Sequence, residues 1–138
     1  MAKKSVNQAG KRKRAVARTT VRKGEGKVNV NGVPLDLVDP QVLREKVRVP
    51  ISIAESFMDL GKISISTKSH GGGVVGQADA IASSIARALV DYSEDDKLLE
   101  AYVTYDRTLI AGDHRQKETR KPSQSSKGAR HKRQKSYR

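Results

Sequence analysis

A run of glycines is the first place where this sequence could do chemistry. Residues 71–76 read Gly-Gly-Gly-Val-Val-Gly and match the Gly-x-Gly-x-x-Gly pattern of dinucleotide sites. The run lies between a predicted strand and a predicted helix, which is the context that such a site needs. However, the chain lacks a second mononucleotide-binding half, and the acids at 94–96 are typical of a helix start. A Walker A loop is excluded because Gln77 and Ala78 follow the last glycine, where Lys and Ser or Thr are required.

The same loop has simpler interpretations. Residues 73–76 fit the bare Gly-x-x-Gly of a KH domain, but their variable pair is apolar. Glycines also permit a tight connection with close backbone approach. Alternatively, the backbone N–H groups at a helix N-terminus can bind an RNA phosphate. The last two interpretations are favoured, and both stay open at this point.

Side chains that could support catalysis are few. The histidines are His70, His114 and His131, and the last two lie in a basic segment. The absence of cysteine excludes disulfides, thiolate metal sites and a cysteine nucleophile. No triad, zincin or paired-carboxylate arrangement can be assembled without free choice of residues. We therefore predict no catalytic residue, no metal and no cofactor, and we expect His70 to lie in a loop that contacts RNA.

The strongest chemical feature is positive charge at both ends. The chain has 28 Lys and Arg against 15 Asp and Glu, a formal charge of +13. Residues 1–27 hold ten bases and one acid, and residues 112–138 hold ten bases and two acids. Residues 28–111 hold eight bases and twelve acids. Basic ends around a near-neutral middle are typical of nucleic-acid-binding proteins, so we predict an intracellular, soluble protein with a polyanionic partner and no membrane.

The mode of recognition follows from the aromatic content, which is 4%. One Phe and four Tyr are too few for a sheet that stacks bases. We therefore expect recognition of the shape and backbone of a folded RNA, with affinity that falls steeply as salt rises.

Alternating residues predict the strands that position these groups. Residues 15–23 alternate, which places Arg14, Arg18 and Arg22 on one face. A second strand is expected over 27–30, between turns at 24–26 and at Asn31-Gly32. Residues 62–68 alternate Ile and Ser and predict another strand with one buried side.

Helices are expected in the rest of the middle. Asp39-Pro40 is typical of a helix start, so we expect a helix through 41–46, which Pro50 interrupts or restarts towards Leu60. The best helical pattern runs from Ala78 to Tyr92. Ser93 is expected to cap a last helix over about 95–105. The order predicts an α+β fold, a small sheet with helices on one face.

The domain organisation is expected in three parts. Residues 1–14 are assigned to a basic arm, residues 15–110 to a globular α+β domain, and residues 111–138 to a basic extended tail. Beyond Ile110 the chain has no Val, Leu, Ile, Met, Phe or Trp, so the tail cannot bury enough surface to order itself alone. Brief trypsin digestion is expected to leave a core near 15–110.

Four ordered motifs resemble the ninth small-subunit ribosomal protein family (universal S-nine). They are Gly10–Arg18; the glycine loop with Gly76-Gln77, Ala80, Ser84 and Ala86-Arg87-Ala88-Leu89; Asp113-His114-Arg115 with Glu118; and Gly128-Ala129-Arg130 with the residues from Gln134 to Arg138. The resemblance covers roughly Val6 to Arg138, and the ending is similar to the archaeal and eukaryotic branch. In bacterial members the last residues read Gln-Phe-Ser-Lys-Arg. Gln134, Ser136 and Arg138 match that ending, whereas Lys135 and Tyr137 depart from it.

The resemblance implies a fold and a place. The fold is the second-domain fold of ribosomal protein five, a small mixed sheet with helices on one face and a left-handed βαβ crossover. The place is the head of the small ribosomal subunit in the cytoplasm, bound to small-subunit rRNA and neighbouring ribosomal proteins. The resemblance also implies that the tail reaches the anticodon stem-loop of P-site tRNA. A structural protein without a small-molecule substrate is therefore expected.

Candidate binding residues combine the basic clusters, the strand face and the glycine loop. The residues expected to bind rRNA are Lys11, Arg12, Lys13, Arg14, Arg18, Arg22, His70, Gly71, Gly72, Gly73, Gln77, Arg115, Arg120, Lys121, Arg130, Lys132 and Arg133. The residues expected to contact tRNA are Lys135, Ser136, Tyr137 and Arg138.

Two other functions remain open from the sequence. The first is a DNA-compacting or other architectural nucleic-acid protein, which co-sedimentation with ribosomal subunits through a high-salt wash would separate from a ribosomal protein. The second is a small nucleotide-binding enzyme that uses the glycine loop. Specific nucleotide binding that is lost in Gly73→Val would support it.

Overall fold

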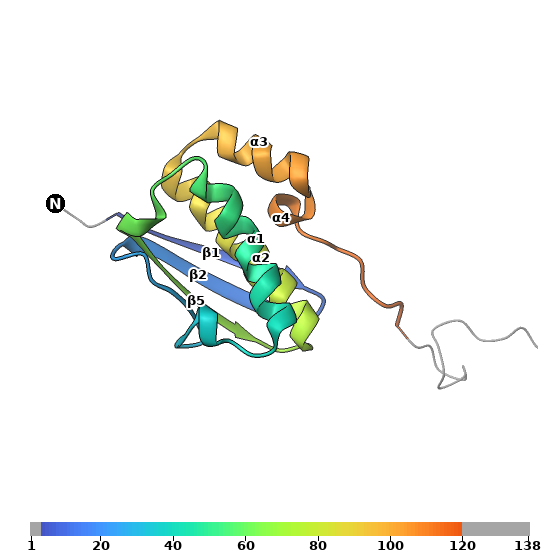
Figure 1. The fold of residues 1–138 in the computed structure, drawn as a ribbon. Helices are drawn as coiled ribbons and strands as arrows, with labels where there is room; N and C mark the ends of the chain where they lie inside the picture. Colours follow the sequence, from blue (N-terminus) through green and yellow to red (C-terminus); the bar gives the residue numbers. More distant parts are fainter. Residues whose placement is uncertain (1–3, 120–138) are drawn as a thin grey trace, which may run out of the picture.

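The computed structural model describes residues 4–119. One mixed sheet of five strands has the order β1-β2-β5-β3-β4, and its helices lie on one side (Figure 1). The strands are β1 (Ser5–Arg12), β2 (Ala15–Lys23), β3 (Val28–Val30), β4 (Val33–Pro34) and β5 (Ile63–His70). The helices are α1 (Gln41–Glu55), α2 (Val74–Ser93), α3 (Asp96–Tyr105) and the short α4 (Thr108–Ala111), with 3-10 turns η1 (Leu35–Leu37) and η2 (Leu60–Lys62). The α+β class and the one-sided helices are confirmed.

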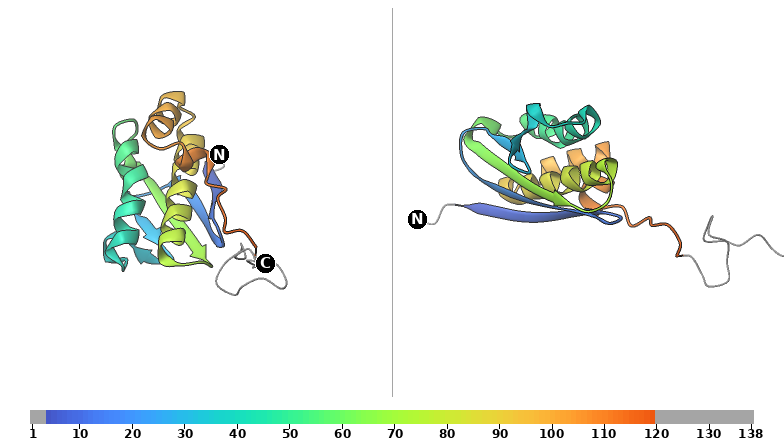
Figure 2. Two further views of the ribbon diagram at one scale, coloured as in Figure 1. Left: turned by 90° about the vertical axis from the view of Figure 1, so that its right-hand side faces the viewer. Right: turned by 90° about the horizontal axis from the view of Figure 1, so that it is seen from below.

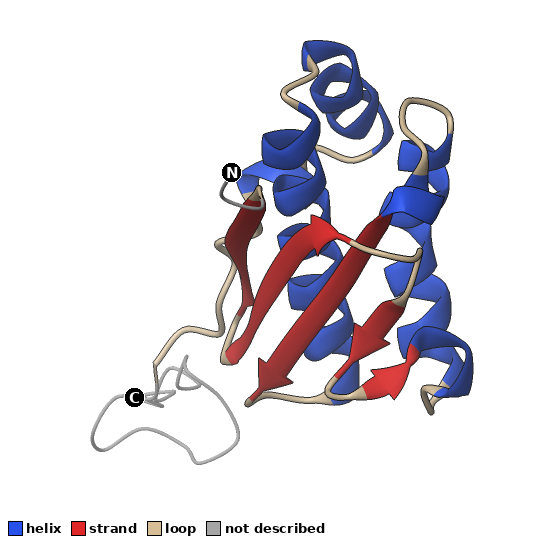
Figure 3. Cartoon of the chain, turned by 90° about the vertical axis from the view of Figure 1, so that its left-hand side faces the viewer, coloured by secondary structure: helices blue, strands red, loops and turns tan. Residues whose placement is uncertain are grey.

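Alternation along the strands separates a covered face from an open face. Ala15, Ala17 and Val21 of β2 and Ile63 and Ile65 of β5 are buried beneath the helices, on the side that we call the covered face. Because successive side chains of a strand point to opposite faces, their neighbours must point to the other side, which we call the open face. Figure 3 shows the open face, where the sheet carries no helix.

The first strand is a correction to the expected domain organisation. From sequence alone, residues 1–14 form an arm outside the globular domain. In the structure, β1 pairs antiparallel with β2 over its whole length, from Ser5 opposite Arg22 to Arg12 opposite Ala15. Gly10 is buried beneath α2, where an added Cβ would lie 2.1 Å from the Ala80 carbonyl oxygen. The strand therefore belongs to the sheet, and its glycine lets α2 approach the backbone.

A βαβ unit joins the two halves of the sheet. β3 and β5 run parallel, with Val28 opposite Ile65, and α1 lies between them in the chain. β3 and β4 form the hairpin that Asn31-Gly32 predicts. The left hand that the family resemblance implies for the crossover stays a prediction.

The helix α1 is continuous through its proline. The sequence suggests a break or a restart at Pro50, but the structure has a single helix that ends at Glu55. Pro50 is buried, and its carbonyl oxygen accepts a hydrogen bond of 2.7 Å from the Tyr102 hydroxyl. Burial raises the pKa of Tyr102 well above its ordinary value. Proline has no N–H for the Lys46 carbonyl oxygen one turn earlier, and packing against α3 stabilises the helix at this point through burial and the Tyr102 hydrogen bond.

The junction of α2 and α3 differs by a few residues from the expectation. Ser93 does not cap α3, because α2 continues through it. Asp95 is the cap, and its carboxylate accepts a hydrogen bond of 2.9 Å from the Lys97 backbone N–H. Within the described residues, no helix combines the length and the apolar character that crossing a membrane requires.

Candidate nucleic-acid interface

The open face of the sheet is basic. Lys11 on β1, Arg18 and Arg22 on β2, and Lys68 and His70 on β5 are all exposed. None of the five described strands contains Asp or Glu. The carboxylates of the described residues therefore lie on the helices and loops. Segregation of this kind gives the open face a positive potential that suits a polyanion.

Strand register brings these charges together in rows. Arg18 lies directly opposite Lys68, and Arg22 lies opposite Ser64. Val16 lies between Lys11 on one side and His70 on the other. Like charges directly opposite each other destabilise a sheet. Arg18 and Lys68 therefore repel each other in the isolated protein, and a bound phosphate backbone would relieve that repulsion.

A second basic group lies at one end of the sheet. The turn between β1 and β2 presents Lys13 and Arg14, both exposed, and the glycine loop lies against this turn. Gly71 has a φ of +75°, and an added Cβ there would lie 2.7 Å from the Arg14 carbonyl oxygen. A Cβ on Gly72 would lie 3.0 Å from the Ala15 backbone nitrogen. The loop is thus a tight connection with close backbone approach, one of the two favoured interpretations.

The phosphate interpretation of the same loop keeps its geometric support. Gly73 precedes α2 in extended conformation, and the open groove beside it has a volume of about 770 Å³. The groove is lined by Lys13 and Arg14 from the turn and by Lys117 from the C-terminal segment. Backbone N–H groups of the first turn of α2 lie among these cations, an arrangement that can accept an anion. The C-terminal segment meets the last residue of β1, where Asp113 forms a bridge with Arg12, and leaves the domain near this end of the sheet (Figure 2).

Gln77 and His70 have different surroundings. The Gln77 amide nitrogen donates a 3.0 Å hydrogen bond to the Gly71 carbonyl oxygen, and its amide oxygen accepts one of 3.3 Å from Ser69. Gln77 therefore holds the glycine loop in place. His70 ends β5 on the open face and is exposed, so it is available to a partner.

Arg12 and Arg115 are engaged within the molecule. The Arg12 guanidinium lies 3.3 Å from the Asp113 carboxylate and donates a 2.8 Å hydrogen bond to the Arg115 carbonyl oxygen. Arg115 also binds the Asp113 carboxylate, with a shortest distance of 2.7 Å. The side chain and backbone N–H of Arg115, with Arg12 beside them, hold the pKa of Asp113 well below its usual range.

The structure thus groups most of the expected rRNA residues that it describes. The open face brings together Lys11, Arg18, Arg22 and His70, and the end of the sheet brings together Lys13, Arg14 and Gly71 to Gly73. The expected residues that lie outside the described range are Arg120, Lys121, Arg130, Lys132, Arg133, Lys135, Ser136, Tyr137 and Arg138.

Sequence reasoning missed Lys68 and the acids around Arg12. The signal for Lys68 was present, because it shares the polar face of its strand with Ser64 and Ser66. The acids that hold Arg12 are Asp79 and Asp113, and they lie in parts of the chain that only the fold brings together. No local spacing could have paired them.

The sheet also bears on the dinucleotide alternative. A doubly wound site needs neighbouring parallel strands whose carboxyl ends meet at a crevice. Here β5, which precedes the glycine loop, is antiparallel to β2 and parallel only to the short β3. Close packing against the turn between β1 and β2 explains Gly71 and Gly72 without a dinucleotide.

Comparison with known proteins gives the family. A family model described as ribosomal protein S9/S16 matches residues 10–138. The small ribosomal subunit protein uS9 of Methanothrix thermoacetophila is 43% identical over 136 residues, which is 98% of this chain and 99% of the relative. The uS9 proteins of Methanococcus maripaludis and Methanococcus vannielii are 42% and 41% identical over 135 residues, again 98% of this chain and 99% of each relative. This chain belongs to the ribosomal protein S9/S16 family.

Proposed function

We propose that this protein, a non-catalytic component of the small ribosomal subunit by its family, binds rRNA through the open face of its sheet and its basic ends. The glycine loop and the turn at Lys13-Arg14 extend this surface at one end. Neighbouring ribosomal proteins of the subunit head are its further partners, and its location is the ribosome in the cytoplasm.

The observation that carries this proposal is the acid-free, basic open face. Arg18 and Arg22 are both exposed and lie on the same side of β2. At about 3.3 Å per residue, their Cα atoms are about 13 Å apart. Guanidinium groups donate to phosphate oxygens in a fixed fork. The two side chains can therefore reach separate phosphates of a folded RNA backbone.

The test compares two double variants, each of which removes two positive charges from a different side of the molecule. Arg18→Gln with Arg22→Gln removes two cations from the open face, whereas Lys97→Gln with Arg107→Gln removes two exposed cations from α3 and the following loop. We expect the open-face variant to lower the slope of log affinity for small-subunit rRNA against log salt by about 1–2. The control pair should change the slope far less, although its net charge is the same. Equal slopes in the two variants would mean that general charge, and not this face, binds rRNA.

We further propose that the tail ends at P-site tRNA. The chain carries ten Lys and Arg after residue 111, and the last four residues include Lys135 and Arg138. The Arg138 side chain offers five donors in a planar fork that matches the oxygens of a phosphate. Tyr137 adds a ring that can stack on a base or ribose.

The test is the release of tRNA from subunits with an altered tail. Deletion of residues 135–138 should leave subunit assembly intact and speed tRNA dissociation, at a cost of about 1–3 kcal/mol for one or two charge-assisted contacts. Arg138→Ala should show part of this loss, and Arg138→Lys an intermediate effect. If the deletion assembles normally and releases tRNA at the original rate, the tail does not hold tRNA.

A further inference from the structure

The segment after α4 is fastened to the edge of the sheet. β1 is an edge strand, and its last residue, Arg12, forms a parallel bridge with Asp113. Three residues earlier in both segments, the Arg87 guanidinium of α2 joins them. It donates hydrogen bonds of 2.8 Å to the Ile110 carbonyl oxygen and 2.9 Å to the Ala9 carbonyl oxygen. The backbone of the C-terminal segment is therefore tied to β1 at two successive places.

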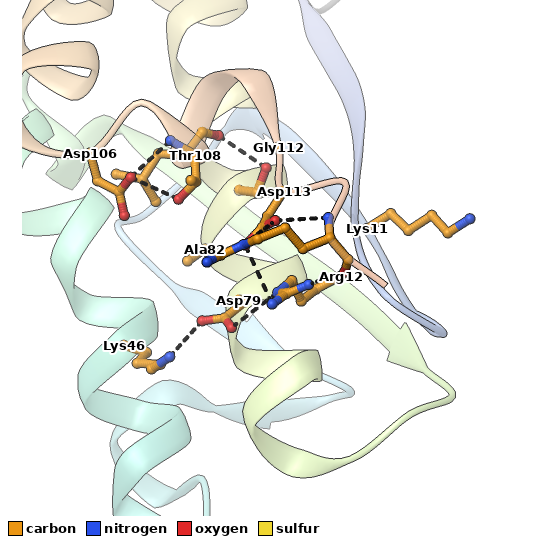
Figure 4. Close-up of a pocket in the computed structure, with 12 residues that line it drawn as sticks. Lys11, Arg12, Lys46, Asp79, Ala82, Asp106, Thr108, Gly112 and Asp113 are labelled. Carbon is orange, nitrogen blue, oxygen red and sulfur yellow. Dashed lines mark hydrogen bonds and ion pairs between the residues drawn. The ribbon is translucent and has the colours of Figure 1, made fainter. Parts of the chain in front are cut away.

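Arg12 is the centre of the second tie. Figure 4 shows its side chain between Asp79 of α2 and Asp113, whereas the neighbouring Lys11 points away. Asp79 lies 4.0 Å from the Arg12 guanidinium and 2.6 Å from the Lys46 ammonium of α1. Charges therefore alternate in sign across the cluster, and β1, two helices and the C-terminal segment each contribute to it.

Burial makes this cluster different from a surface ion pair. The Arg12 side chain is 17% exposed and that of Asp113 is 11% exposed. Exposed pairs contribute little because water screens them, whereas partly buried pairs are screened much less. The Arg12 fork also engages two groups of the segment at once, the Asp113 carboxylate and the Arg115 carbonyl oxygen. That combination fixes a direction as well as a position.

We propose that Arg12 and Asp113 are positioning residues that form a latch, and that the latch sets the direction in which the tail leaves the domain. The part that concerns tRNA rests on the proposed function of the tail. Because the latch holds residues 113–115, it decides where the twenty-three residues from 116 to 138 begin. A fixed origin and direction raise the effective concentration of the tail tip at its target.

The first test measures the position of the tail origin in the full-length protein. The native chain has no cysteine, so spin labels on Gln116→Cys and Thr104→Cys, both exposed, report a unique distance. In Arg12→Gln and in Asp113→Asn, we expect a distance distribution about twofold wider than in the otherwise native double-cysteine chain. Arg12→Lys keeps the charge without the fork and should give an intermediate width.

The control is Lys11→Gln, which removes the same charge one residue away from the latch. Its distribution should match that of the otherwise native chain, because Lys11 lies on the open face. If Arg12→Gln does not fold, Asp113→Asn decides, since it removes one charge and keeps the shape of the side chain. An unchanged distribution in the folded Asp113→Asn variant would overturn the latch.

The second test asks whether the latch serves the tail tip. Subunits that carry Asp113→Asn should release P-site tRNA faster than native subunits, and less fast than subunits that lack residues 135–138. If that deletion has no effect on tRNA, the proposed tRNA function fails while the distance measurement still decides the latch. If the deletion speeds release and Asp113→Asn does not, the latch has no part in holding tRNA.

Discussion

The two faces of the sheet use the same strands for opposite purposes. On the covered face, Gly10, Ala15 and Ala17 are small enough for α2 to pack close to the backbone. On the open face, the alternate positions carry Lys11 and Arg18, which no described strand carboxylate neutralises. The covered face therefore stabilises the domain, and the open face carries a positive charge that favours a polyanionic partner. Consecutive residues of one strand can be changed with almost independent consequences.

Lys11 and Arg12 show the difference most clearly. Both are basic and adjacent, and net charge alone would assign them the same task. Lys11 lies on the open face opposite Val16, whereas Arg12 turns towards the helices and binds Asp113. A count of basic residues therefore overstates the proposed binding surface, because the side of the strand decides whether a cation faces outward or binds another part of the protein.

Among changes to the two faces, deletion of the whole first strand should have the largest effect on stability. Removal of residues 1–14 takes away the edge strand that α2 covers, so we expect the remaining chain not to fold cooperatively. Removal of residues 1–4 stops before β1 and should leave the unfolding transition close to native. Circular dichroism during urea titration distinguishes the two. A cooperative, near-native transition without residues 1–14 would show that β1 is only an arm.

A single methyl group on the covered face should have the next largest effect. Gly10→Ala would place a Cβ 2.1 Å from the Ala80 carbonyl oxygen and 2.7 Å from the Ser84 nitrogen. We expect the free energy of unfolding to fall by about 2–3 kcal/mol as α2 is forced away. Gly73→Ala is the control, because no atom lies within 4 Å of its added Cβ. Similar losses in the two variants would contradict the close packing of α2 on β1.

A buried chain of hydroxyls on the covered face permits a finer test. The Ser84 hydroxyl donates to the Ile81 carbonyl oxygen at 2.8 Å, so it must accept from Thr19, which lies 2.6 Å away. Thr19 must then accept from Thr67, at 2.8 Å. Thr19→Val deletes the middle of the chain and should cost about 2 kcal/mol, whereas Thr67→Val deletes only its end and should cost about 1 kcal/mol. Chemical denaturation of both variants checks the order, and the reverse order would contradict the central place of Thr19 in the chain of hydroxyls.

A change on the open face should have the smallest effect on stability, with the opposite sign. Arg18→Thr removes the like-charge neighbour of Lys68 and introduces a residue that suits a strand. We expect the free energy of unfolding to rise by about 0.2–0.5 kcal/mol at low salt and this gain to shrink as salt screens the repulsion. Thermal unfolding at two salt concentrations measures it. A clear loss of stability would show that Arg18 stabilises the fold instead of repelling Lys68.

The sequence predicted the strands and helices whose pattern is local. The Ile and Ser alternation of 62–68 and the helical spacing from Ala78 to Tyr92 both appear in the structure, as β5 and α2. By contrast, β1 was missed because its covered side carries Gly10 and Arg12. Neither residue is apolar, so the strand lacks the alternation that marks its partner. It is recognised only once β2 and α2 are in place beside it.

What the sequence determined by itself was the charge at both ends, the faces of the alternating strands and the family. These properties depend on residue types and on short spacings along the chain, which are the same before and after folding. Only the tertiary structure decided that Arg12 serves the protein while Lys11 faces outward, and that Gln77 holds the glycine loop. The ion pair of Arg12 with Asp113 joins residues from opposite ends of the domain. The ion pair forms because the segment after α4 passes the edge strand β1 in the folded protein. No local sequence pattern indicates that this segment and β1 are neighbours.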